Sequence, residues 1–418
     1  MKIEIGYGTK PQTLKIPSER ILDILYPNPL SDVPDEPAIL REALNCPIAS
    51  APLSDLVRGR QKVVIITSDI TRPMPSYKVL PLLLLELEAA GIRRSQIRIV
   101  FALGSHRRHT EAEKKKLAGS EVYASVPCED SSESGFLPLG VTAMGTPVEI
   151  CRTVAEADFR ICLGNIEYHY FAGYSGGAKA IMPGVSTRAA IQKNHSHMVH
   201  EHACVGRIDG NPVRADLEEA LAYCPVDFMF NVILDEHKRI IHAVCGHVIK
   251  AHREGCRFLD RLYRKEIPKL ADIVIASQGG APKDLNLYQT QKALENARHA
   301  VRPGGVILLV GACPEGLGEH TFEEWMTSDM SPEERIARIR TDFQLGGHKA
   351  AAIAIVQKTA RIFLISQMPP DFVRSIHLKP FSSVQTAYEA ANELLGGNAS
   401  VLVMPYGGST LPVLSSKR

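Results

Sequence analysis

Four short polar stretches carry the side chains that could do chemistry in this sequence. The first, SDITRP, holds Asp69, Thr71 and Arg72, and a guanidinium beside prolines suits two-point capture of a carboxylate. Apart from Arg72, the stretch fits a simple Asp-capped turn equally well. The second, GSHRRHT, holds His106, whose imidazole can accept or donate a proton near neutral pH. The two stretches together indicate acid or base chemistry near an anion-binding group.

The third stretch, GNIEYHYFAGYSGGAKAIMPG, holds His169, Gly176, Gly177 and Lys179. Glycines let backbone N–H groups approach a phosphate closely, and a lysine beside them adds a positive charge. The stretch is not a P-loop, because Ala180 stands where Ser or Thr should bind magnesium. It predicts a nucleotide-binding loop and does not imply hydrolysis of the nucleotide.

A run of histidines follows, with four of them between His195 and His202. Imidazole is a ligand for zinc, copper, iron and nickel, so the run can form a metal site. A cluster of surface histidines without a metal is the alternative that spacing leaves open. No HExxH motif is present, which argues against a zinc protease.

The fourth stretch, GGAPKDLNLYQTQKA, places Tyr288, Gln289 and Lys292 in the first turns of a predicted helix. Residues three and four apart are neighbours on a helix surface, so these side chains can point the same way. The pattern predicts a polar face that contacts a ligand.

The elements that must position these stretches alternate between β-branched apolar runs and amphipathic runs of helical length, which is typical of an α/β fold. Strands are predicted at residues 63–67, 97–103, 158–163, 227–234, 271–276, 305–310, 360–366 and 401–408. Helices are predicted at residues 78–90, 111–118, 211–224, 247–264, 288–301, 332–340, 347–357 and 383–395. Thr110 with Glu113 fits a capping box for the second of these helices.

We expect two α/β domains with mostly parallel sheets and an active-site cleft between them. Residues 1–268 are expected to form a cofactor-binding catalytic domain and residues 269–398 a second α/β domain. Residues 399–418 form a strand and tail that either close the second domain or return to the first. Each polar stretch follows a predicted strand, and ligands bind outside the carboxyl ends of parallel strands, so one composite pocket is expected.

Composition excludes several classes of protein. Hydrophobic residues make up 45% and charged residues 22% of the chain, and the formal net charge is only +2, which offers no broad positive field for nucleic acid or an anionic membrane. The nine cysteines are scattered and never spaced as CxxC, which is typical of reduced thiols in a core. The first residues lack an apolar signal region, so a cytoplasmic protein is expected.

Taken together, the four ordered motifs resemble the nickel-dependent lactate racemase family, from the SDITRP turn to the GGHKA segment that begins at Gly346. The resemblance implies a nickel-pincer nucleotide, a pyridinium-3,5-bisthiocarboxylic acid mononucleotide, tethered to Lys179 through a thioamide. It implies that His195 is the protein ligand of nickel and that His106 and His169 are the acid and base. Partner proteins that synthesise and load the cofactor are implied as well.

The implied reaction is racemisation or epimerisation of a small 2-hydroxy acid, by hydride transfer through a 2-keto acid. A cofactor must accept the hydride because side chains cannot. The other site residues that the resemblance implies are Asp69, Thr71, Arg72, Gly176 and Gly177 for the cofactor, and Arg72, Tyr288, Gln289 and Lys292 for the substrate. His348 of GGHKA, near where a pocket tryptophan of the family would fall, is expected to contact the substrate as well.

One departure from the family pattern concerns the substrate pocket. Lactate-specific members carry a tryptophan in the second domain, whereas the only tryptophan here is Trp325, in a different sequence context. We therefore expect a roomier or more polar pocket, suited to malate-like, aromatic or sugar acids. Two other functions stay open: a zinc- or iron-dependent hydrolase that uses residues 195–202, and a non-catalytic nucleotide-binding protein.

Overall fold

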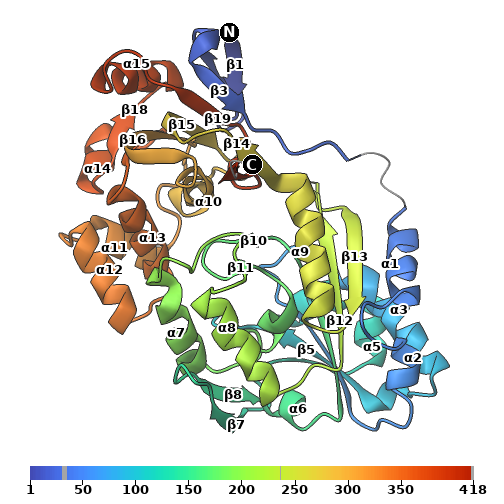
Figure 1. Cartoon of the computed structure of the whole chain (residues 1–418). Helices are drawn as coiled ribbons and strands as arrows, with labels where there is room; N and C mark the ends of the chain where they lie inside the picture. Colours follow the sequence, from blue (N-terminus) through green and yellow to red (C-terminus); the bar gives the residue numbers. More distant parts are fainter. Residues whose placement is uncertain (31–34, 236, 416–418) are drawn as a thin grey trace. The chain divides into compact units, whose positions relative to one another are not determined.

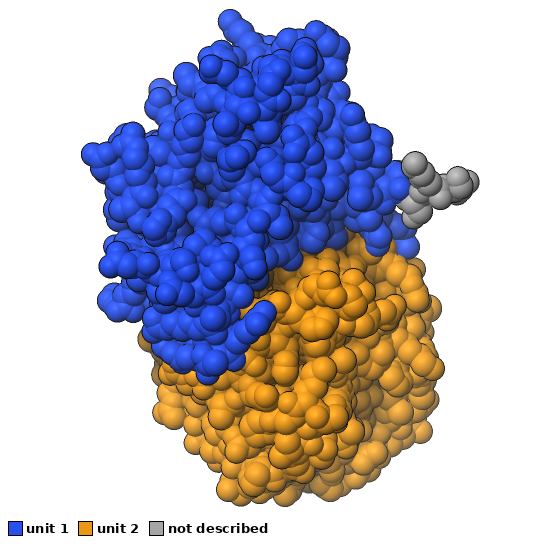
Figure 2. All heavy atoms as spheres, turned by 60° about the vertical axis from the view of Figure 1, so that its left-hand side comes forward, with its two compact units in different colours: residues 1–29, 261–418 blue, residues 30–260 orange. Residues whose placement is uncertain are grey.

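The computed structural model describes residues 1–30, 35–235 and 237–415, and the chain divides into two compact units (Figures 1 and 2). Unit 1 combines Met1–Pro29 with Arg261–Arg418, and unit 2 comprises Leu30–Asp260. This division differs from the expected one, because the N-terminal segment belongs with the C-terminal half of the chain. The predicted C-terminal strand also stays in unit 1.

Unit 2 is built on a six-stranded sheet with the order β13-β12-β9-β4-β5-β6. Its strands are β4 (Val63–Ser68), β5 (Ile97–Ala102), β6 (Cys128–Asp130), β9 (Phe159–Asn165), β12 (Phe228–Leu234) and β13 (Ile240–Gly246). Neighbouring strands are parallel, except that β13 pairs antiparallel with β12 at one edge. The four strands predicted in this part of the chain are present, and β6 and β13 are additional.

The helices of unit 2 cover both faces of this sheet. They are α1 (Glu36–Asn45), α2 (Leu53–Leu56), α3 (Ser76–Ala89), α4 (Glu111–Ala118), α5 (Ser120–Ser125), α6 (Arg152–Ala155), α7 (Arg188–Ser196), α8 (Pro212–Glu219) and α9 (Lys250–Tyr263), whose last turn enters unit 1. Alternate strand residues such as Ile65 and Ile99 share a buried core with α1, α3, α4 and α5. On the opposite face α9 packs so closely that a Cβ at Gly255 would lie 3.0 Å from Val244.

Short elements complete unit 2 and build the loops above the sheet. They are the hairpins β7 (Phe136–Val141) with β8 (Pro147–Cys151) and β10 (Tyr168–His169) with β11 (Gly173–Tyr174), and the 3-10 turns η2 (Arg94–Gln96), η3 (Gly177–Ala180), η4 (His197–Val199) and η5 (Ala220–Ala222). The capping box predicted at α4 is confirmed, because Thr110 and Glu113 exchange both hydrogen bonds.

Unit 1 contains a second six-stranded sheet, with the order β18-β17-β16-β15-β19-β3 and every pair parallel. Its strands are β3 (Ile21–Ile24), β15 (Ala271–Ser277), β16 (Val301–Val310), β17 (Arg361–Ile365), β18 (Lys379–Phe381) and β19 (Val401–Met404). The blue N-terminal strands and the red C-terminal elements of Figure 1 therefore lie together although they are far apart in the sequence. β3 pairs with β19 in the sheet, and β1, β2 and α15 pack on it.

The helices of unit 1 are α10 (Leu287–Ala297), α11 (His320–Thr327), α12 (Pro332–Thr341), α13 (Gly347–Gln357), α14 (Pro370–Ser375) and α15 (Val384–Leu394), with the 3-10 turn η1 (Ser18–Arg20). The hairpin of β1 (Lys2–Ile5) and β2 (Gln12–Lys15) packs with α15 over one face of the sheet. A separate parallel pair joins β14 (Arg264–Ile267) to β20 (Leu411–Leu414).

Three of the predicted elements have boundaries that differ from the observed ones. The helix predicted at residues 288–301 ends at Ala297. The backbone N–H of Ala300 donates to the carbonyl oxygen of Ala297 in a turn, and the carbonyl oxygen of Ala300 accepts the N–H of Ala271 at the start of β15. The strand that follows consequently begins at Val301. The helix predicted at residues 211–224 divides into α8 and η5.

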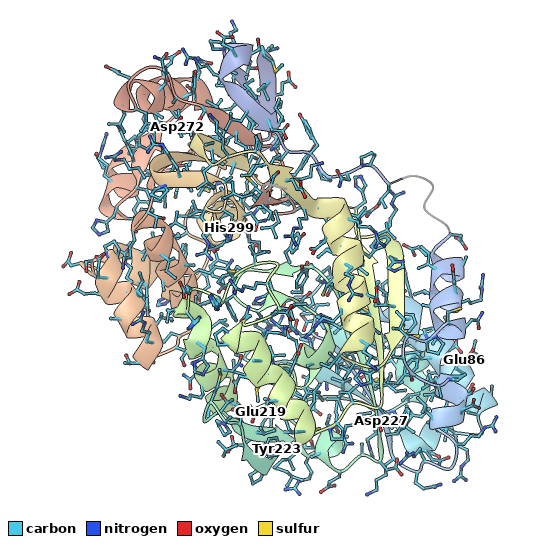
Figure 3. All side chains as sticks on the ribbon, in the orientation of Figure 1. Glu86, Glu219, Tyr223, Asp227, Asp272 and His299 are labelled. Carbon is cyan, nitrogen blue, oxygen red and sulfur yellow. The ribbon has the colours of Figure 1, made fainter. Side chains whose placement is uncertain are left out.

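A half-buried polar tie joins the strands of unit 1 at Asp272, which is labelled in Figure 3. The Asp272 carboxylate accepts hydrogen bonds from the backbone N and the Oγ of Ser400, at 2.8 and 2.6 Å, and from Nε of Arg302 at 2.5 Å. Burial raises the pKa of Asp272, but these donors outweigh it and lower the pKa to about 2.

The nine cysteines, all within the described residues, form no disulfide, and six of them are buried, as the sequence predicted. Within the described part of the chain, no helix is both long and apolar enough to span a bilayer.

Candidate active site

Three neighbouring parallel strands of unit 2 deliver the site residues to one edge of the sheet. β4 lies between β9 and β5, and the polar stretches predicted from the sequence follow the carboxyl ends of these three strands. The topology therefore explains why stretches far apart in sequence meet: Asp69 is 37 residues from His106 and 100 residues from His169.

Asp69 and His106 form a hydrogen-bonded pair at this edge. Asp69 is 2% exposed, and its Oδ2 contacts Nδ1 of His106. Its Oδ1 accepts hydrogen bonds from the backbone N and the Oγ1 of Thr71, at 2.8 and 2.6 Å. Burial raises the pKa of Asp69, but the hydrogen bond and charge of His106, the hydroxyl of Thr71 and the charge of Arg72 lower it below its usual value.

A second histidine–carboxylate pair, His109 with Asp130, holds the loop that follows β4. Nε2 of His109 accepts the backbone N–H of Ile70 at 3.0 Å, and its Nδ1 lies 2.5 Å from Oδ1 of Asp130. Both side chains are buried, and Asp130 also accepts the backbone N–H of His109 at 2.8 Å. His109 thus links β6 to the turn that presents Asp69, a role that sequence reasoning missed.

The ring of Phe171 is the centre of a second group of site residues. The ring centroid of His169 lies 4.5 Å away, that of His195 lies 4.8 Å away, and Nζ of Lys179 lies 5.9 Å away. The structure therefore brings together one imidazole from β10, one from α7 and the amine of η3 around one aromatic ring. Phe171 itself carried no signal in the sequence beyond its place in the third polar stretch.

Burial and neighbouring positive charges lower the pKa of two members of this group, His169 and Lys179. Burial and the charges of Lys179, Arg72, His195 and Arg214 lower the pKa of His169 well below 6.5. Burial and the charges of Arg72 and Arg214, opposed by Glu167, lower the pKa of Lys179 well below 10.5. Because Arg72 also acts on Asp69, its charge connects the two groups of site residues.

The Gly-rich loop needs its glycines for close contacts as well as for backbone conformation. Gly176 has a φ of +74°, and a Cβ there would lie 2.5 Å from Oδ1 of Asn231. Gly177 has a φ of +59°, and a Cβ there would lie 2.9 Å from the ring of His252. Its backbone N–H donates to Oδ1 of Asn231 at 2.8 Å, so β12 holds the loop that carries Lys179.

His195 differs from the other histidines of its run. It is buried on α7, with Nδ1 3.0 Å from Oδ1 of Asn194, whereas His200 is exposed and stacks edge-on with His202. Among the residues that the structure describes, no three His, Cys, Asp or Glu side chains gather as a metal site. A three-ligand zinc or iron site built from residues 195–202 thus has no counterpart there.

Arg214 on α8 is a further residue of this region that sequence reasoning missed. It is 1% exposed, and its guanidinium donates to the carbonyl oxygens of Ala172 and Tyr174. Burial lowers its pKa, opposed by the charge of Glu218. Arg214 therefore fixes the backbone on either side of Gly173 and adds positive charge behind His169 and Lys179.

The site residues predicted in the second half of the chain lie in unit 1. Tyr288 and Gln289 occupy the first turn of α10, where Oδ1 of Asn286 caps the helix through the N–H of Gln289 at 3.0 Å. Lys292 is exposed on the same helix, and His348 is buried on α13.

A lysine that the sequence did not single out connects these two helices. Nζ of Lys349 donates to the carbonyl oxygen of Tyr288 at 2.5 Å and lies 3.7 Å from the centroid of its ring. The adjacent His348 accepts the N–H of Gly346 through Nδ1 at 2.9 Å, and burial lowers its pKa to about 3. The position of Lys349 within GGHKA was the available clue.

Trp325 lies against the GGHKA segment. It is buried on α11, and a Cβ at Gly347 would lie 2.5 Å from its ring. Its Nε1 donates to Oε1 of Gln344 at 3.1 Å. The only tryptophan is therefore distant from His348 in sequence but packs beside the helix that carries it.

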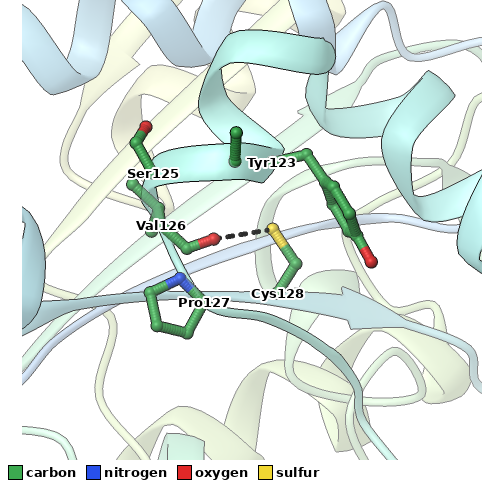
Figure 4. Close-up of a pocket in the computed structure, with 6 residues that line it drawn as sticks. Tyr123, Ser125, Val126, Pro127 and Cys128 are labelled. Carbon is green, nitrogen blue, oxygen red and sulfur yellow. Dashed lines mark hydrogen bonds between the residues drawn. The ribbon is translucent and has the colours of Figure 1, made fainter.

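A surface hollow elsewhere in unit 2 contains no comparable chemistry. It is lined by Tyr123–Cys128 and has a volume of about 400 Å³ (Figure 4). The thiol of Cys128 lies 3.3 Å from the carbonyl oxygen of Val126, and burial raises its pKa to about 12. A thiol of this kind is not a nucleophile at neutral pH.

Two segments of the chain match known protein domains. Residues 7–206 match the lactate racemase N-terminal domain, and residues 267–411 match the lactate racemase C-terminal domain. The fold and the matched domains define a two-domain α/β isomerase of the racemase type. The chain belongs to the lactate racemase family.

Individual relatives extend over nearly the whole chain. It is 32% identical to the lactate racemase of Thermoanaerobacterium thermosaccharolyticum, over 98% of each chain, and 31% identical to that of Lactiplantibacillus plantarum, over 97% of this chain and 98% of that one. The structure matches the lactate racemase apoprotein of T. thermosaccharolyticum with a TM-score of 0.89, at 32% identity over 99% of this chain and 100% of that chain. A Thermotoga maritima protein with a TM-score of 0.62 and 18% identity, over 92% of this chain and 99% of that one, shares the fold.

Proposed function

We propose that the protein racemises or epimerises a small 2-hydroxy acid, with a nickel-pincer nucleotide tethered to Lys179. The observation that carries this proposal is the group of His169, His195 and Lys179 around Phe171, beside the Asp69–His106 pair. Family membership supports the racemase activity, and the residues of this group supply an amine, an imidazole ligand and two proton carriers.

The residues present fit the cofactor. A lysine with a lowered pKa has more of its amine uncharged at neutral pH, as formation of a thioamide requires. Gly176 and Gly177 let the loop that carries Lys179 pack against Asn231 and His252, which holds the lysine in place, and His195 offers a buried imidazole, a good ligand for nickel. Lys179 would hold the cofactor covalently and His195 would bind its metal. When bound, the cofactor supplies the hydride acceptor that side chains cannot provide.

Proton transfer falls to the two histidines. We assign His106 to the substrate hydroxyl, because the Asp69 carboxylate at its Nδ1 stabilises the imidazolium that forms. His169 has no carboxylate among the groups that set its pKa, so it returns a proton readily once charged. One proton and one hydride leave one enantiomer and one of each enters the other, so no reactant is consumed; His106 and His169 return to their starting protonation states by exchanging protons with water.

Substrate binding is assigned to cationic and polar side chains. Arg72, exposed at the end of β4, would capture the substrate carboxylate through its guanidinium. From the resemblance we assign Tyr288, Gln289 and Lys292 to the substrate as well, and we add His348 because it lies near where a pocket tryptophan of the family would fall. A 2-hydroxy acid larger or more polar than lactate is the substrate we favour, because the segment beside Trp325 carries the polar His348 and Lys349.

The test is a chirality assay on protein produced together with the cofactor-synthesis proteins. A panel of lactate, malate, an aromatic 2-hydroxy acid and a sugar acid is supplied as single enantiomers. We expect interconversion of at least one pair, one nickel per active chain and added mass on Lys179. Stoichiometric zinc or iron on an unmodified chain with hydrolase activity would favour the hydrolase. A loaded protein inactive on the whole panel would favour a nucleotide-binding protein.

A further inference from the structure

A buried chain of hydrogen bonds runs from α8 to His195. Nδ2 of Asn194 donates to Oδ2 of Asp216 at 2.7 Å and to the carbonyl oxygen of Val213 at 3.2 Å. Oδ1 of the same amide lies 3.0 Å from Nδ1 of His195. Asn194 and Asp216 are at most 1% exposed, so water does not compete for these contacts.

The orientation of Asp216 is itself fixed by two buried hydroxyls. Oγ1 of Thr142 accepts the backbone N–H of Thr146 at 3.1 Å and donates to Oδ1 of Asp216 at 2.5 Å. Oγ1 of Thr146 donates to Oδ2 of Asp216 at 2.7 Å. The turn between β7 and β8 therefore aims the carboxylate at Asn194.

The neighbours of Asn194 decide which way its amide points. The carboxylate of Asp216 and the carbonyl of Val213 can only accept hydrogen bonds, so the NH₂ end of the amide must face them. The oxygen end then faces His195. A carbonyl oxygen cannot donate, so Nδ1 of a neutral His195 must carry the hydrogen and Nε2 must be the nitrogen without one.

We propose that Asp216 is a positioning residue that, through Asn194, holds His195 in the tautomer whose Nε2 lone pair can bind a metal. A metal takes the imidazole nitrogen that bears no hydrogen, and the partner of the other nitrogen fixes the tautomer and the ring orientation. Here the neutral amide of Asn194 contacts His195, and the carboxylate of Asp216 acts on the histidine only through that amide. The inference rests on the proposed function only for the identity of the metal group.

The tautomer can be measured in protein that holds no cofactor. Protein labelled with ¹⁵N-histidine is studied by NMR, at a pH well above the ordinary histidine value of about 6.5, and couplings to the ring protons show which nitrogen carries the hydrogen. The signal of His195 is identified by its loss in His195→Gln. We expect the hydrogen on Nδ1, and a hydrogen on Nε2 would overturn the proposal.

Two substitutions of Asp216 distinguish control of the His195 tautomer from a merely structural role. Asp216→Asn keeps an oxygen that can accept from Asn194, so His195 should keep its hydrogen on Nδ1. Asp216→Leu has a similar shape but accepts nothing, so the amide is released and the Nε2–H form should become populated. An unchanged tautomer in folded Asp216→Leu protein, shown by its circular dichroism, would overturn the role of Asp216.

A second variant covers the case in which Asp216→Leu does not fold. Asn194→Leu removes the acceptor of His195 and leaves Asp216 with both threonine hydroxyls, so it should also populate the Nε2–H form. If His195 kept its hydrogen on Nδ1 in this variant, another group would set the tautomer and the proposal would fail.

Cofactor-loaded protein gives a readout that separates this inference from the proposed function. Asp216→Leu should lower nickel retention and racemisation about 10- to 100-fold, as is typical when the partner of a metal-binding histidine is removed, and Asp216→Asn should stay near wild type. A confirmed tautomer with no racemisation on any substrate would reject the proposed function and leave the inference standing. Equal nickel retention in both variants would reject the inference alone.

Discussion

Single residues at this site owe their chemistry to what surrounds them. Lys179 and His169 share the ring of Phe171 and the charges of Arg72 and Arg214, and these surroundings lower the pKa of both groups. His106, in contrast, faces the buried carboxylate of Asp69. The two proton carriers thus differ in their neighbours: a carboxylate contacts His106, whereas positive charges surround His169.

The lowered pKa of Lys179 leads to a prediction about covalent loading. In protein produced with the cofactor-synthesis proteins, Lys179→Ala should show no added mass, because no other amine of the Gly-rich loop can form the thioamide. Lys193→Ala, at an exposed lysine on α7, is the matched control and should load like wild type. Intact-protein mass spectrometry gives the answer. Added mass on Lys179→Ala protein would place the attachment elsewhere.

The Asp69–His106 pair leads to a prediction about rate. Asp69→Asn replaces a carboxylate that stabilises the imidazolium of His106, so kcat/KM should fall about 100- to 10,000-fold, the range of general acid–base catalysis. The exposed Asp209→Asn should leave kcat/KM unchanged. Both are assayed on loaded protein with matched nickel content. A loss below threefold would remove His106 from the proton transfer.

Sequence patterns could find the residues that carry chemistry but not those that orient them. The imidazoles, the amine and the guanidinium stand in unusual polar stretches, which drew attention to His106, His169 and Lys179. Asp216 lies in an ordinary amphipathic helix, and Phe171 is one aromatic residue among several. Their roles depend on contacts across the fold, which spacing along the chain does not contain.

At the scale of elements, strands at the centre of a sheet were the easiest to predict. β4, β9 and β15 are mainly apolar and almost wholly buried, because a central parallel strand is covered on both faces. The short strands β6 and β18 and the hairpin of β7 and β8 were not predicted, since edge strands of three to six residues have mixed burial. The missed elements still matter, because β6 carries Asp130 and the turn after β7 carries Thr142.

The polar tie at Asp272 leads to a prediction about stability and pH. Its pKa of about 2 is below the ordinary 3.8, so its stabilising effect is present above about pH 4 and is lost as the pH falls toward 2. The shift would convert to somewhat over 2 kcal/mol, and partial exposure reduces this to about 1 kcal/mol. Asp272→Asn should cost about that much at pH 7 and nothing near pH 2.

Denaturant unfolding at several pH values, followed by circular dichroism, measures this difference. The exposed Asp329→Asn serves as the control and should leave the curves unchanged. A cost of Asp272→Asn that is equal at pH 7 and pH 2.5 would show that the charge of the carboxylate contributes nothing.

At the scale of the whole molecule, the class of fold followed from the sequence but the division of the chain did not. Periodicity identifies strands without naming their partners, and β3 pairs with β19 across almost the entire chain. The N-terminal segment therefore joins unit 1, and unit 2 is an insertion between β3 and β14 in sequence. The family models, which cover residues 7–206 and 267–411, follow sequence order and do not show this return either.

The most direct test of the account follows the hydrogen on the α-carbon of the substrate. One enantiomer of an active 2-hydroxy acid, deuterated at Cα, is converted by loaded protein in ordinary water, and the deuterium content of the opposite enantiomer is measured by mass spectrometry. Transfer as hydride predicts that the product keeps its deuterium, because that hydrogen never exchanges with solvent. Product that carries hydrogen from water would show that the α-carbon is deprotonated instead, and would contradict the account.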